Sequence, residues 1–270
     1  MGVIAITGSA SGMGAALAEH LTKAGHRVIG VDLRNAEVTA DLATPDGRAH
    51  AIAEVTRLAE GSLDGFLPFA GLAAATGRPG GLLVSVNYFG AITLLEGLRP
   101  LLRAGSNPSV VLISSNSTTT QPGWPVELAD ACLAGDEERA RGIAESFGDL
   151  GAIQAYPATK AALAWYARTR CAEYIKEGIR LNAVAPGLID TPMTQAGRDD
   201  ALTREGLKGF LGATPIGRAG RPEEIADLVA FLLSERAGFF VGSVIFCDGG
   251  IDAAFRGKDW PAMWDIPLHP

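Results

Sequence analysis

The chain alternates short runs of aliphatic and β-branched residues with longer helical stretches, and this alternation most constrains its fold. Strands are expected at residues 3–7, 27–31, 64–70, 109–113, 179–185 and 243–246, with a shorter strand-like piece at 37–41. Helices are expected at residues 12–25, 44–60, 81–103, 156–177 and 222–233. Apolar strands that alternate with helices are typical of a parallel sheet covered on both faces. The sequence therefore predicts an α/β fold with a single doubly wound, Rossmann-like parallel sheet flanked by helices.

Two segments depart from this alternation. Residues 116–150 contain Pro122 and Pro125 and then a charged run, and we expect a loop followed by one or two amphipathic helices there. Residues 251–270 are expected to form a tail docked on the body. We find no internal repeat and no low-complexity linker in the sequence. Residues 1–270 are therefore predicted to be a single domain with a helical insertion at about 116–150 and a lid at about 191–212.

Composition excludes several classes of protein. With 270 residues and 47% apolar content, the chain can bury a large core. A net charge of -7 argues against nucleic acid as a partner, because phosphate binding needs a basic surface. We find no unbroken apolar run long enough for a membrane span, and a strand that begins at Val3 leaves no room for a signal peptide. The three cysteines lack CxxC spacing and the four histidines form no metal-ligand pattern, so we expect free thiols, a cytoplasmic location and no metal.

A glycine-rich turn, TGSASGMG, joins the first expected strand to the first helix. Gly8, Gly12 and Gly14 would permit a tight turn and close approach of a pyrophosphate to the helix N-terminus. A glycine-rich turn without a ligand is the alternative. Asp32 ends the second strand, where a carboxylate accepts hydrogen bonds from the adenosine ribose and repels a 2′-phosphate. The sequence therefore predicts NAD rather than NADP as cofactor, although Arg34 would offset part of the charge.

Tyr156 and Lys160 are four residues apart on a predicted helix and share one face. A free tyrosine has a pKa of about 10, and a neighbouring ammonium favours the phenolate and lowers that pKa. Tyr156 would then exchange a proton with a carbonyl or alcohol oxygen, and Lys160 could also hold the nicotinamide ribose. Ser115, at the end of the fifth strand, could hydrogen-bond the same oxygen. A chance Tyr–Lys pair on a helix surface is the alternative, and the glycine motif together with Ser115 disfavours it.

Over essentially its whole length the chain resembles the short-chain dehydrogenase/reductase family. The matching pieces are TGSASGMG, Asp32, Asn87, Ser115 after VLIS, YPATK, NAVAPGLIDTP and FCDGG. The resemblance implies a catalytic tetrad made of Asn87, Ser115, Tyr156 and Lys160. Asn87 would hold a water molecule in a proton relay from Lys160 to solvent. An asparagine satisfied locally in its helix is the alternative.

The family also implies which residues bind NAD. They lie in the glycine-rich turn, at the ends of the second to fourth strands, on the catalytic helix and after the sixth strand. The set is Gly8, Ser9, Ala10, Ser11, Gly12, Met13, Gly14, Asp32, Asp41, Leu42, Ala70, Gly71, Tyr156, Lys160, Pro186, Gly187, Ile189 and Thr191. Asp41 and Leu42 would flank the adenine, although a simple strand-end aspartate is nearly as well supported. The last four residues of the set would face the nicotinamide.

Departures from the family pattern narrow the match. The usual NNAG after the fourth strand is PFAG here, and Asp32 and Asp41 leave no room for a helix between their strands. The residues at 116–150 are additional. In these features the chain is similar to the bacterial 3α-hydroxysteroid dehydrogenase/carbonyl reductase group, to which coniferyl-alcohol-type dehydrogenases are also similar. In that group the insertion covers a face that other relatives use for tetramer assembly, which implies a homodimer.

Apolar side chains are expected to line the substrate pocket. The expected lid supplies Met193, Leu202, Leu207, Phe210 and Leu211, and the insertion and tail could add Trp124, Trp260, Met263 and Trp264. An apolar pocket suits a steroid, a bulky ketone or an aromatic alcohol as substrate. Alternatively, the aromatic side chains only pin the loop and the tail to the body.

The favoured hypothesis is an NAD-dependent oxidoreductase that interconverts an alcohol and a carbonyl compound. Steroids and xenobiotic carbonyls lead as substrates, and aryl alcohols come second. A catalytically idle NAD-binding sensor is a second hypothesis, which loss of Tyr156, Lys160 or Ser115 would have favoured. A structural partner protein that uses the insertion is a third.

Overall fold

The predicted strands form one parallel sheet in a computed structural model that describes residues 2–196 and 201–261. Its order is β3-β2-β1-β4-β5-β6-β7, and every neighbouring pair is parallel. The strands are β1 (Val3–Thr7), β2 (Arg27–Asp32), β3 (Val38–Thr39), β4 (Gly65–Pro68), β5 (Ser109–Ile113), β6 (Arg180–Pro186) and β7 (Val244–Cys247). Strand order reverses between β1 and β4, which is the arrangement of a doubly wound sheet. The predicted fold class is therefore confirmed.

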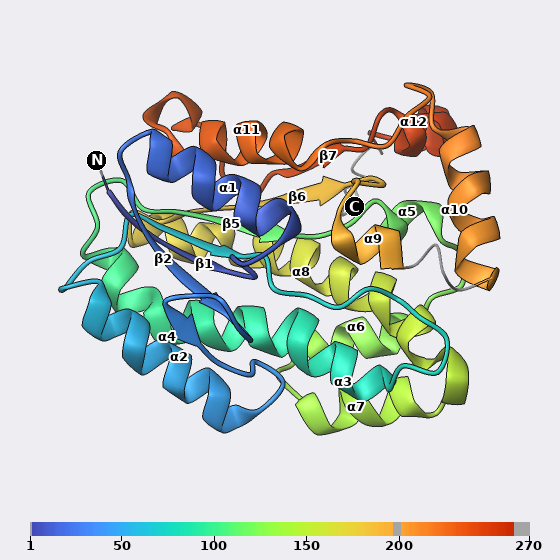
Figure 1. Cartoon of the computed structure of the whole chain (residues 1–270), viewed down its shortest axis with the longest axis horizontal. Coiled ribbons are helices and arrows are strands. Elements are labelled where there is room, and N and C mark those ends of the chain that lie inside the picture. The colour runs from blue at the N-terminus through green and yellow to red at the C-terminus, as the bar shows by residue number, and fades with distance from the viewer. Residues whose placement is uncertain (1, 197–200, 262–270) are drawn as a thin grey trace, which may run out of the picture.

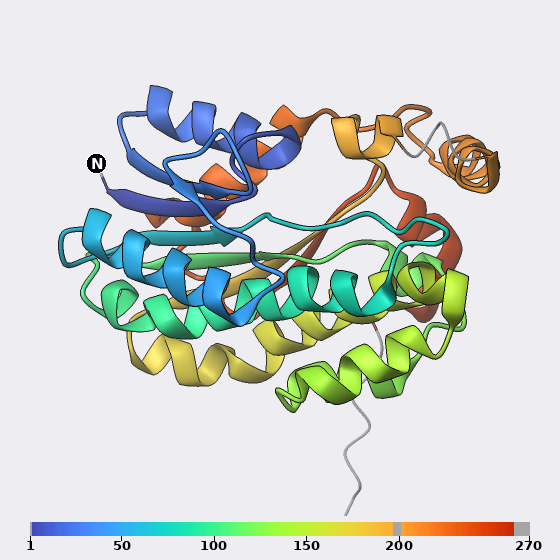
Figure 2. The same ribbon diagram turned by 60° about the horizontal axis from the view of Figure 1, so that its bottom comes forward.

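Helices cover both faces of this sheet (Figure 1, Figure 2). One face carries α1 (Gly12–Lys23) and α11 (Pro222–Leu233), whose apolar sides pack with β-strand residues such as Ile6 in one core cluster. The other face carries α2 (Pro45–Leu58), α4 (Gly90–Arg103) and α8 (Gly151–Lys176), which enclose a larger cluster around Phe66. Strands β4, β5 and β6 are buried throughout because helices lie on both of their sides.

The expected helix at 81–103 is a compound element. It begins as α3 (Gly80–Val84), continues through a π-helical turn, η1 (Ser85–Phe89), and ends as α4. By length and composition alone Gly80–Arg103 could cross a membrane, but 67% of its most apolar window is buried inside the structure. Its apolar character is therefore explained by packing against the sheet. The π turn carries Asn87, and such turns occur frequently at functional sites.

The insertion is helical, as predicted. It contains α5 (Ser117–Thr120), α6 (Val126–Leu133), α7 (Glu137–Glu145) and the 3-10 turn η2 (Gly148–Leu150). Helix α7 packs on α3, and α6 packs on α8. The approach is so close that a Cβ on Gly80 would lie 2.9 Å from the Cβ of Ala144. Arg48 of α2, itself buried, pairs with Glu137 at 2.9 Å and ties the insertion to the body.

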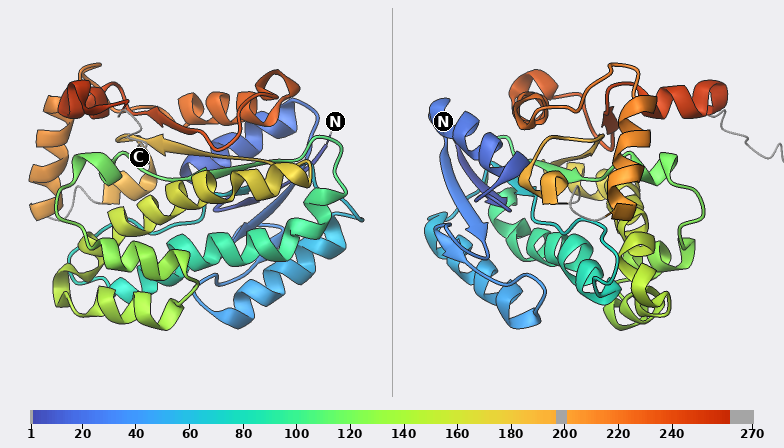
Figure 3. Two further views of the ribbon diagram at one scale, coloured as in Figure 1. Left: turned by 180° about the vertical axis from the view of Figure 1, so that it is seen from behind. Right: turned by 45° about the vertical axis from the view of Figure 1, so that its right-hand side comes forward.

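The remaining elements gather at the carboxyl ends of the strands (Figure 3). They are α9 (Pro192–Ala196), α10 (Ala201–Ala213), α12 (Ile251–Arg256) and η4 (Gly257–Asp259), while η3 (Glu235–Ala237) follows α11. The expected lid thus contains two helices. Residues 33–37 form no helix between β2 and β3, as the short spacing predicted. Helix α8 begins at Gly151, earlier than the predicted start at Tyr156, so that Tyr156 lies inside the helix.

Candidate active site

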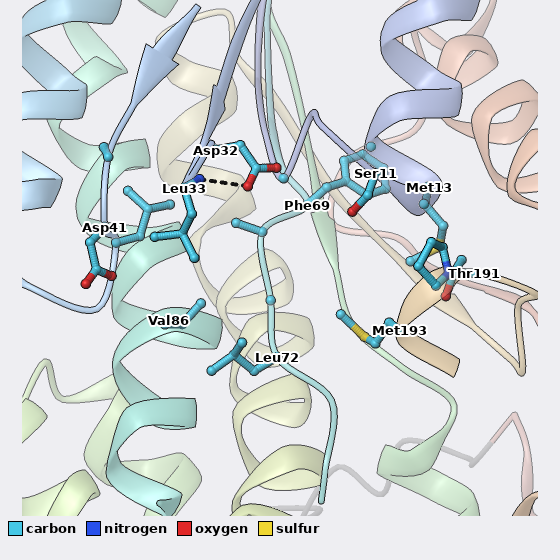
Figure 4. Close-up of a pocket in the computed structure, with 18 residues that line it drawn as sticks. Ser11, Met13, Asp32, Leu33, Asp41, Phe69, Leu72, Val86, Thr191 and Met193 are labelled. Carbon is cyan, nitrogen blue, oxygen red and sulfur yellow. Dashed lines mark hydrogen bonds between the residues drawn. The ribbon is translucent and has the colours of Figure 1, made fainter. Parts of the chain in front are cut away.

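A cleft opens at the carboxyl ends of β1, β2 and β4, where the strand order reverses (Figure 4). Eleven of the predicted cofactor residues line it: Gly8, Ser11, Gly12, Met13, Gly14, Asp32, Asp41, Leu42, Ala70, Gly71 and Thr191. The lining also includes seven residues outside the predicted cofactor set, namely Leu33, Ala40, Phe69, Leu72, Val86, Pro192 and Met193. Leu33 could have been predicted in this lining, because it is an apolar residue directly after Asp32 in a loop that also contains Arg34 and Asn35.

The glycine-rich turn has the shape that a pyrophosphate needs. Gly8 and Gly12 adopt positive φ angles of 71° and 56°. A Cβ on Gly8 would lie 2.7 Å from the backbone nitrogen of Ala70, and one on Gly14 would lie 2.1 Å from the carbonyl oxygen of Gly8. The Ser11 side chain makes no capping hydrogen bond to the first turn of α1. The backbone N–H groups at this helix start are therefore not satisfied by a side-chain cap. These features fit a dinucleotide phosphate.

Asp32 ends β2 at the rim of the cleft (Figure 4). Its two carboxylate oxygens accept hydrogen bonds from the backbone nitrogens of Ala10, at 3.0 Å, and Leu33, at 2.7 Å. Ala10 therefore orients the carboxylate rather than lining the cleft. Ser9 lies over β2, where a Cβ on Gly30 would meet its hydroxyl oxygen at 2.6 Å. The negative charge of Asp32 thus stands in a fixed orientation beside the glycine-rich turn.

Lys160 and Tyr156 lie on α8, as the four-residue spacing predicted. Lys160 is 6% exposed, its Nζ donates a hydrogen bond of 2.9 Å to the carbonyl oxygen of Ile113, and burial lowers its pKa to about 8. Its Nζ lies 5.8 Å from the centre of the Tyr156 ring. Burial raises the pKa of Tyr156, and a hydrogen bond with Ser115 acts in the opposite direction. Ser115 therefore opposes the effect of burial on Tyr156, and the expectation that Lys160 also lowers this pKa stays a prediction.

Ser115 lies two residues beyond the end of β5 and is 7% exposed. Its hydroxyl oxygen accepts a hydrogen bond of 3.1 Å from the backbone nitrogen of Ser117, which leaves the hydroxyl proton available to another oxygen. The neighbouring Ser114 hydroxyl donates to the carbonyl oxygen of Lys160 at 2.8 Å. This contact joins the end of β5 to α8, so Ser115, Tyr156 and Lys160 are held as one group.

Asn87 is buried in the π turn, and its side-chain amide is occupied. The amide oxygen accepts a hydrogen bond of 2.7 Å from the Leu72 nitrogen, and the amide nitrogen donates to the Leu72 carbonyl at 3.0 Å. A Cβ on Gly71 would lie 3.3 Å from this amide oxygen and 3.9 Å from Lys160 Nζ. Asn87 therefore lies beside Lys160, as the tetrad requires. Its side chain, however, braces the segment after β4, where the family's usual asparagine is replaced by Phe69.

The residues expected to face the nicotinamide separate into two groups. Thr191, 6% exposed, lines the cleft and lies opposite Gly12, whose Cβ would meet its methyl group at 3.4 Å. Pro186, Gly187 and Ile189 are not part of the lining described above. Gly187 packs against Asp248, and Ile189 is 5% exposed in the core cluster beneath α11. The expectation that these three residues face the nicotinamide therefore stays a prediction.

Of the aromatic residues expected to form pocket walls, Trp124 packs on α8, whereas Trp260 contacts Arg256 in its own C-terminal segment. The Trp124 ring lies against the Trp165 ring at a tilt of 53° with ring centres 5.8 Å apart, and its indole donates to the Thr118 carbonyl at 3.1 Å. Trp260 lies 5.1 Å from the Arg256 guanidinium and is 53% exposed. Met193 lines the cleft, and α10 carries Phe210 and Leu211. The side chains of Leu202 and Leu207, together with Met263 and Trp264, lie outside the described residues.

Known proteins share this sequence and this architecture. The model of the NAD dependent epimerase/dehydratase family matches residues 4–195, and a model described as Enoyl-(Acyl carrier protein) reductase matches residues 144–252. The chain is 42% identical to 3-alpha-hydroxysteroid dehydrogenase/carbonyl reductase of Comamonas testosteroni, over 95% of this chain and 98% of that protein. It is 32% identical to 2-(S)-hydroxypropyl-CoM dehydrogenase 3 of Xanthobacter autotrophicus, over 93% of this chain and 96% of that one.

A crystal structure of 3-alpha-hydroxysteroid dehydrogenase from Pseudomonas sp. B-0831, complexed with NADH, superposes with a TM-score of 0.89. That protein is 45% identical, and the match covers 95% of this chain and 99% of the other. Levodione reductase, at 27% identity, superposes with a TM-score of 0.72 over 93% and 98% of the two chains. Fold, cleft and relatives together define an NAD-dependent oxidoreductase. The chain belongs to the short-chain dehydrogenase/reductase family.

Proposed function

We propose that this protein interconverts a secondary alcohol and a ketone with NAD(H), as a 3α-hydroxysteroid dehydrogenase/carbonyl reductase-like enzyme. The observation that carries the proposal is the joint placement of two sets of residues. Ser115, Tyr156 and Lys160 are tied together by the bonds that join β5 to α8, at the same end of the sheet as the glycine-rich turn. A proton-transfer group and a hydride carrier would therefore act on the oxygen and the carbon of the same carbonyl or alcohol group.

Tyr156 would exchange the proton at the substrate oxygen. Because burial raises the pKa of Tyr156, the phenol is protonated near neutrality and is ready to donate to a carbonyl oxygen in reduction. In alcohol oxidation the same group must first lose its proton, so oxidation gains from alkaline pH. Ser115 would share a hydrogen bond with the same oxygen and stabilise the charge that develops on it. Bound NAD supplies the hydride acceptor, and NADH supplies the donor.

Asp32 and the glycine-rich turn would bind NAD. The turn is tight, because any Cβ on Gly8 or Gly14 would collide with backbone, and a tight turn allows a pyrophosphate to approach the start of α1 closely. The Asp32 carboxylate, oriented by two backbone N–H groups, is suited to ribose hydroxyls and repels a 2′-phosphate. Lys160 and Thr191 would contact the nicotinamide half. The Asn87 side-chain amide is occupied by the backbone of Leu72. A water molecule in a proton relay to Lys160 would therefore bind to the backbone of the π turn rather than to the Asn87 side chain.

An apolar carbonyl compound or alcohol fits best as substrate. Met193 presents an apolar side chain to the cleft, and α10 brings Phe210 and Leu211 to the same end of the sheet. The two relatives with the greatest identity quoted above are named for 3α-hydroxysteroids. We therefore propose steroids and bulky ketones ahead of aryl alcohols.

The first test is NADH formation, followed by absorbance, over a panel of 3α-hydroxysteroids, aryl alcohols and small secondary alcohols, with NADP run in parallel. We expect turnover with NAD that is selective for steroids. Turnover with aryl alcohols alone would retain the mechanism and reject the steroid assignment. Tyr156→Phe should lose at least about a hundredfold in turnover, because proton transfer by a positioned group contributes that much, while NADH affinity stays unchanged. Near-normal turnover of this variant, or NAD binding without turnover of any substrate by the wild type, would refute the proposal.

The oligomeric state and location form a separate part of the proposal. Helix α7 packs on α3 and thereby covers a helix that would otherwise be free to associate, which supports a dimer over a tetramer. Cys132, Cys171 and Cys247 are all free thiols, which suits a reducing cytoplasm. Light scattering coupled to size exclusion should give the mass of two chains. The mass of four chains would overturn this part without affecting the catalytic proposal.

A further inference from the structure

The turn that carries Ser115 continues into α5, and the backbone closes tightly after it. The Ser115 carbonyl accepts a hydrogen bond of 2.8 Å from the Thr118 hydroxyl, and the Asn116 carbonyl accepts one from the Thr119 backbone nitrogen at 3.0 Å. Asn116 also donates from its backbone nitrogen to Pro186 at the end of β6, at 3.0 Å. The position of the Ser115 hydroxyl therefore depends on the placement of the whole short helix α5.

A carboxylate from the far end of the chain binds α5. Asp252 lies in the first turn of α12 and is 6% exposed. Its Oδ1 accepts a hydrogen bond from the Thr119 hydroxyl, across 133 positions of sequence. An aspartate at the start of a short helix is ordinarily solvated, so the burial of this side chain against α5 marks a specific contact. Burial costs the ionised carboxylate hydration, which only strong partners offset.

Two further contacts hold Asp252 in place. Arg256 donates to both of its carboxylate oxygens, at 2.7 and 2.8 Å, in a bidentate pair. The Arg256 guanidinium in turn lies 5.3 Å from the Phe246 ring of β7 and 5.1 Å from the Trp260 ring. Asp248 accepts from the backbone nitrogen of Asp252 at 2.8 Å. The pKa of Asp252 is lowered overall: burial raises it, but the hydrogen bonds from Arg256 and Thr119 outweigh burial.

We propose that Thr119 and Asp252 are positioning residues for Ser115, and that their contact fixes the turn from which the Ser115 hydroxyl reaches the reacting oxygen. The inference rests on the proposed catalytic role of Ser115. It assigns the C-terminal helix α12 a function in turnover, although α12 contributes no side chain to the cofactor cleft described above. A displacement of a catalytic group by about 1 Å can lower turnover by about a hundredfold, so a single remote contact suffices.

The test compares isosteric variants of Thr119 in the full-length enzyme. Thr119→Val removes the hydroxyl and keeps the volume, whereas Thr119→Ser keeps the hydroxyl and serves as the rescue. We expect kcat for alcohol oxidation to fall by about tenfold or more in Thr119→Val, and to return to within about threefold of wild type in Thr119→Ser. The Kd for NADH, measured by fluorescence, should stay within about twofold in both. Thr22→Val, which loses a hydroxyl bond to Ala18 on the exposed side of α1, is the matched control and should keep wild-type kcat.

Double variants separate positioning from general destabilisation. If the contact acts through Ser115, Thr119→Val should lower kcat in the wild-type background and have no further effect in a Ser115→Ala background. Thr119→Val combined with Asp252→Ala should likewise be no slower than the slower single variant. Multiplying effects in either pair would overturn the inference, as would wild-type kcat in Thr119→Val alongside an impaired Ser115→Ala. Normal turnover of Ser115→Ala would instead refute the proposed role of Ser115 itself.

Discussion

Replacement of Lys160 by methionine should stabilise the protein while it abolishes efficient turnover. Lys160 is 6% exposed, and burial lowers its pKa from the ordinary value of 10.5 to about 8. At about 1.4 kcal/mol per pKa unit, this difference means that the ammonium form costs about 3 kcal/mol of folding free energy. Methionine has similar length and no charge to desolvate. It leaves the Ile113 carbonyl without its donor, which offsets about 1 kcal/mol of the gain.

The expected gain depends on pH in a definite direction. Below pH 8 both the folded and the unfolded chain carry the Lys160 proton, so the full cost of about 3 kcal/mol applies. Between pH 8 and pH 10.5 the unfolded chain holds more protons at this side chain than the folded chain, so the stability of the wild type rises with pH. Lys160→Met should therefore be more stable than the wild type by about 2 kcal/mol at pH 7, and this advantage should vanish near pH 10.

Urea unfolding at pH 7, 8, 9 and 10, without added cofactor, measures this difference directly. The control is Lys176→Met, the same substitution on an exposed position of the same helix, which should show no such trend. A stability difference for Lys160→Met that does not change with pH would refute the reasoning, since it would mean that burial does not perturb this ammonium. Turnover at saturating substrate should fall at least about a hundredfold, because Lys160 lies beside the proton-transfer tyrosine and would contact the nicotinamide half of the cofactor.

Three further outcomes follow from the geometry. Asp32→Ala should narrow the preference for NAD over NADP, because the carboxylate that repels a 2′-phosphate is gone; an unchanged ratio of kcat/KM for the two cofactors would place Asp32 away from the ribose. Gly14→Ala should abolish NADH binding in a fluorescence titration, because its Cβ would lie 2.1 Å from the Gly8 carbonyl oxygen and distort the turn. Gly142→Ala is the control: open space surrounds its Cβ, so this variant should bind NADH normally and raise the unfolding free energy by about 0.5–1 kcal/mol. Arg180→Met should lower the unfolding free energy by about 3 kcal/mol in urea titrations, because this buried guanidinium donates to four carbonyl oxygens at the end of α11 and in the turn beyond it; a loss below about 1 kcal/mol would contradict that role.

Local rules carried the prediction of the sheet and of the catalytic helix. Apolar runs without polar alternation predict buried parallel strands, and the strand order confirms them. The glycine-rich turn could be predicted from sequence because glycine tolerates positive φ angles at little cost. Gly8 and Gly12 do adopt such angles. Tyr156 and Lys160 share a face because helix geometry places positions four apart together, wherever the helix begins. Even an error of five residues in the start of α8 left that inference intact.

The sequence by itself thus determined the fold class, the family and the identity of the candidate catalytic group. Only the tertiary structure decided what surrounds that group. Burial, which no local pattern encodes, controls the pKa values of Tyr156 and Lys160. The bond between Thr119 and Asp252 joins segments 133 positions apart, and it exists because the topology brings α12 to the carboxyl end of β5. Spacing rules describe neighbours along one element, whereas contacts between elements depend on how the whole chain packs.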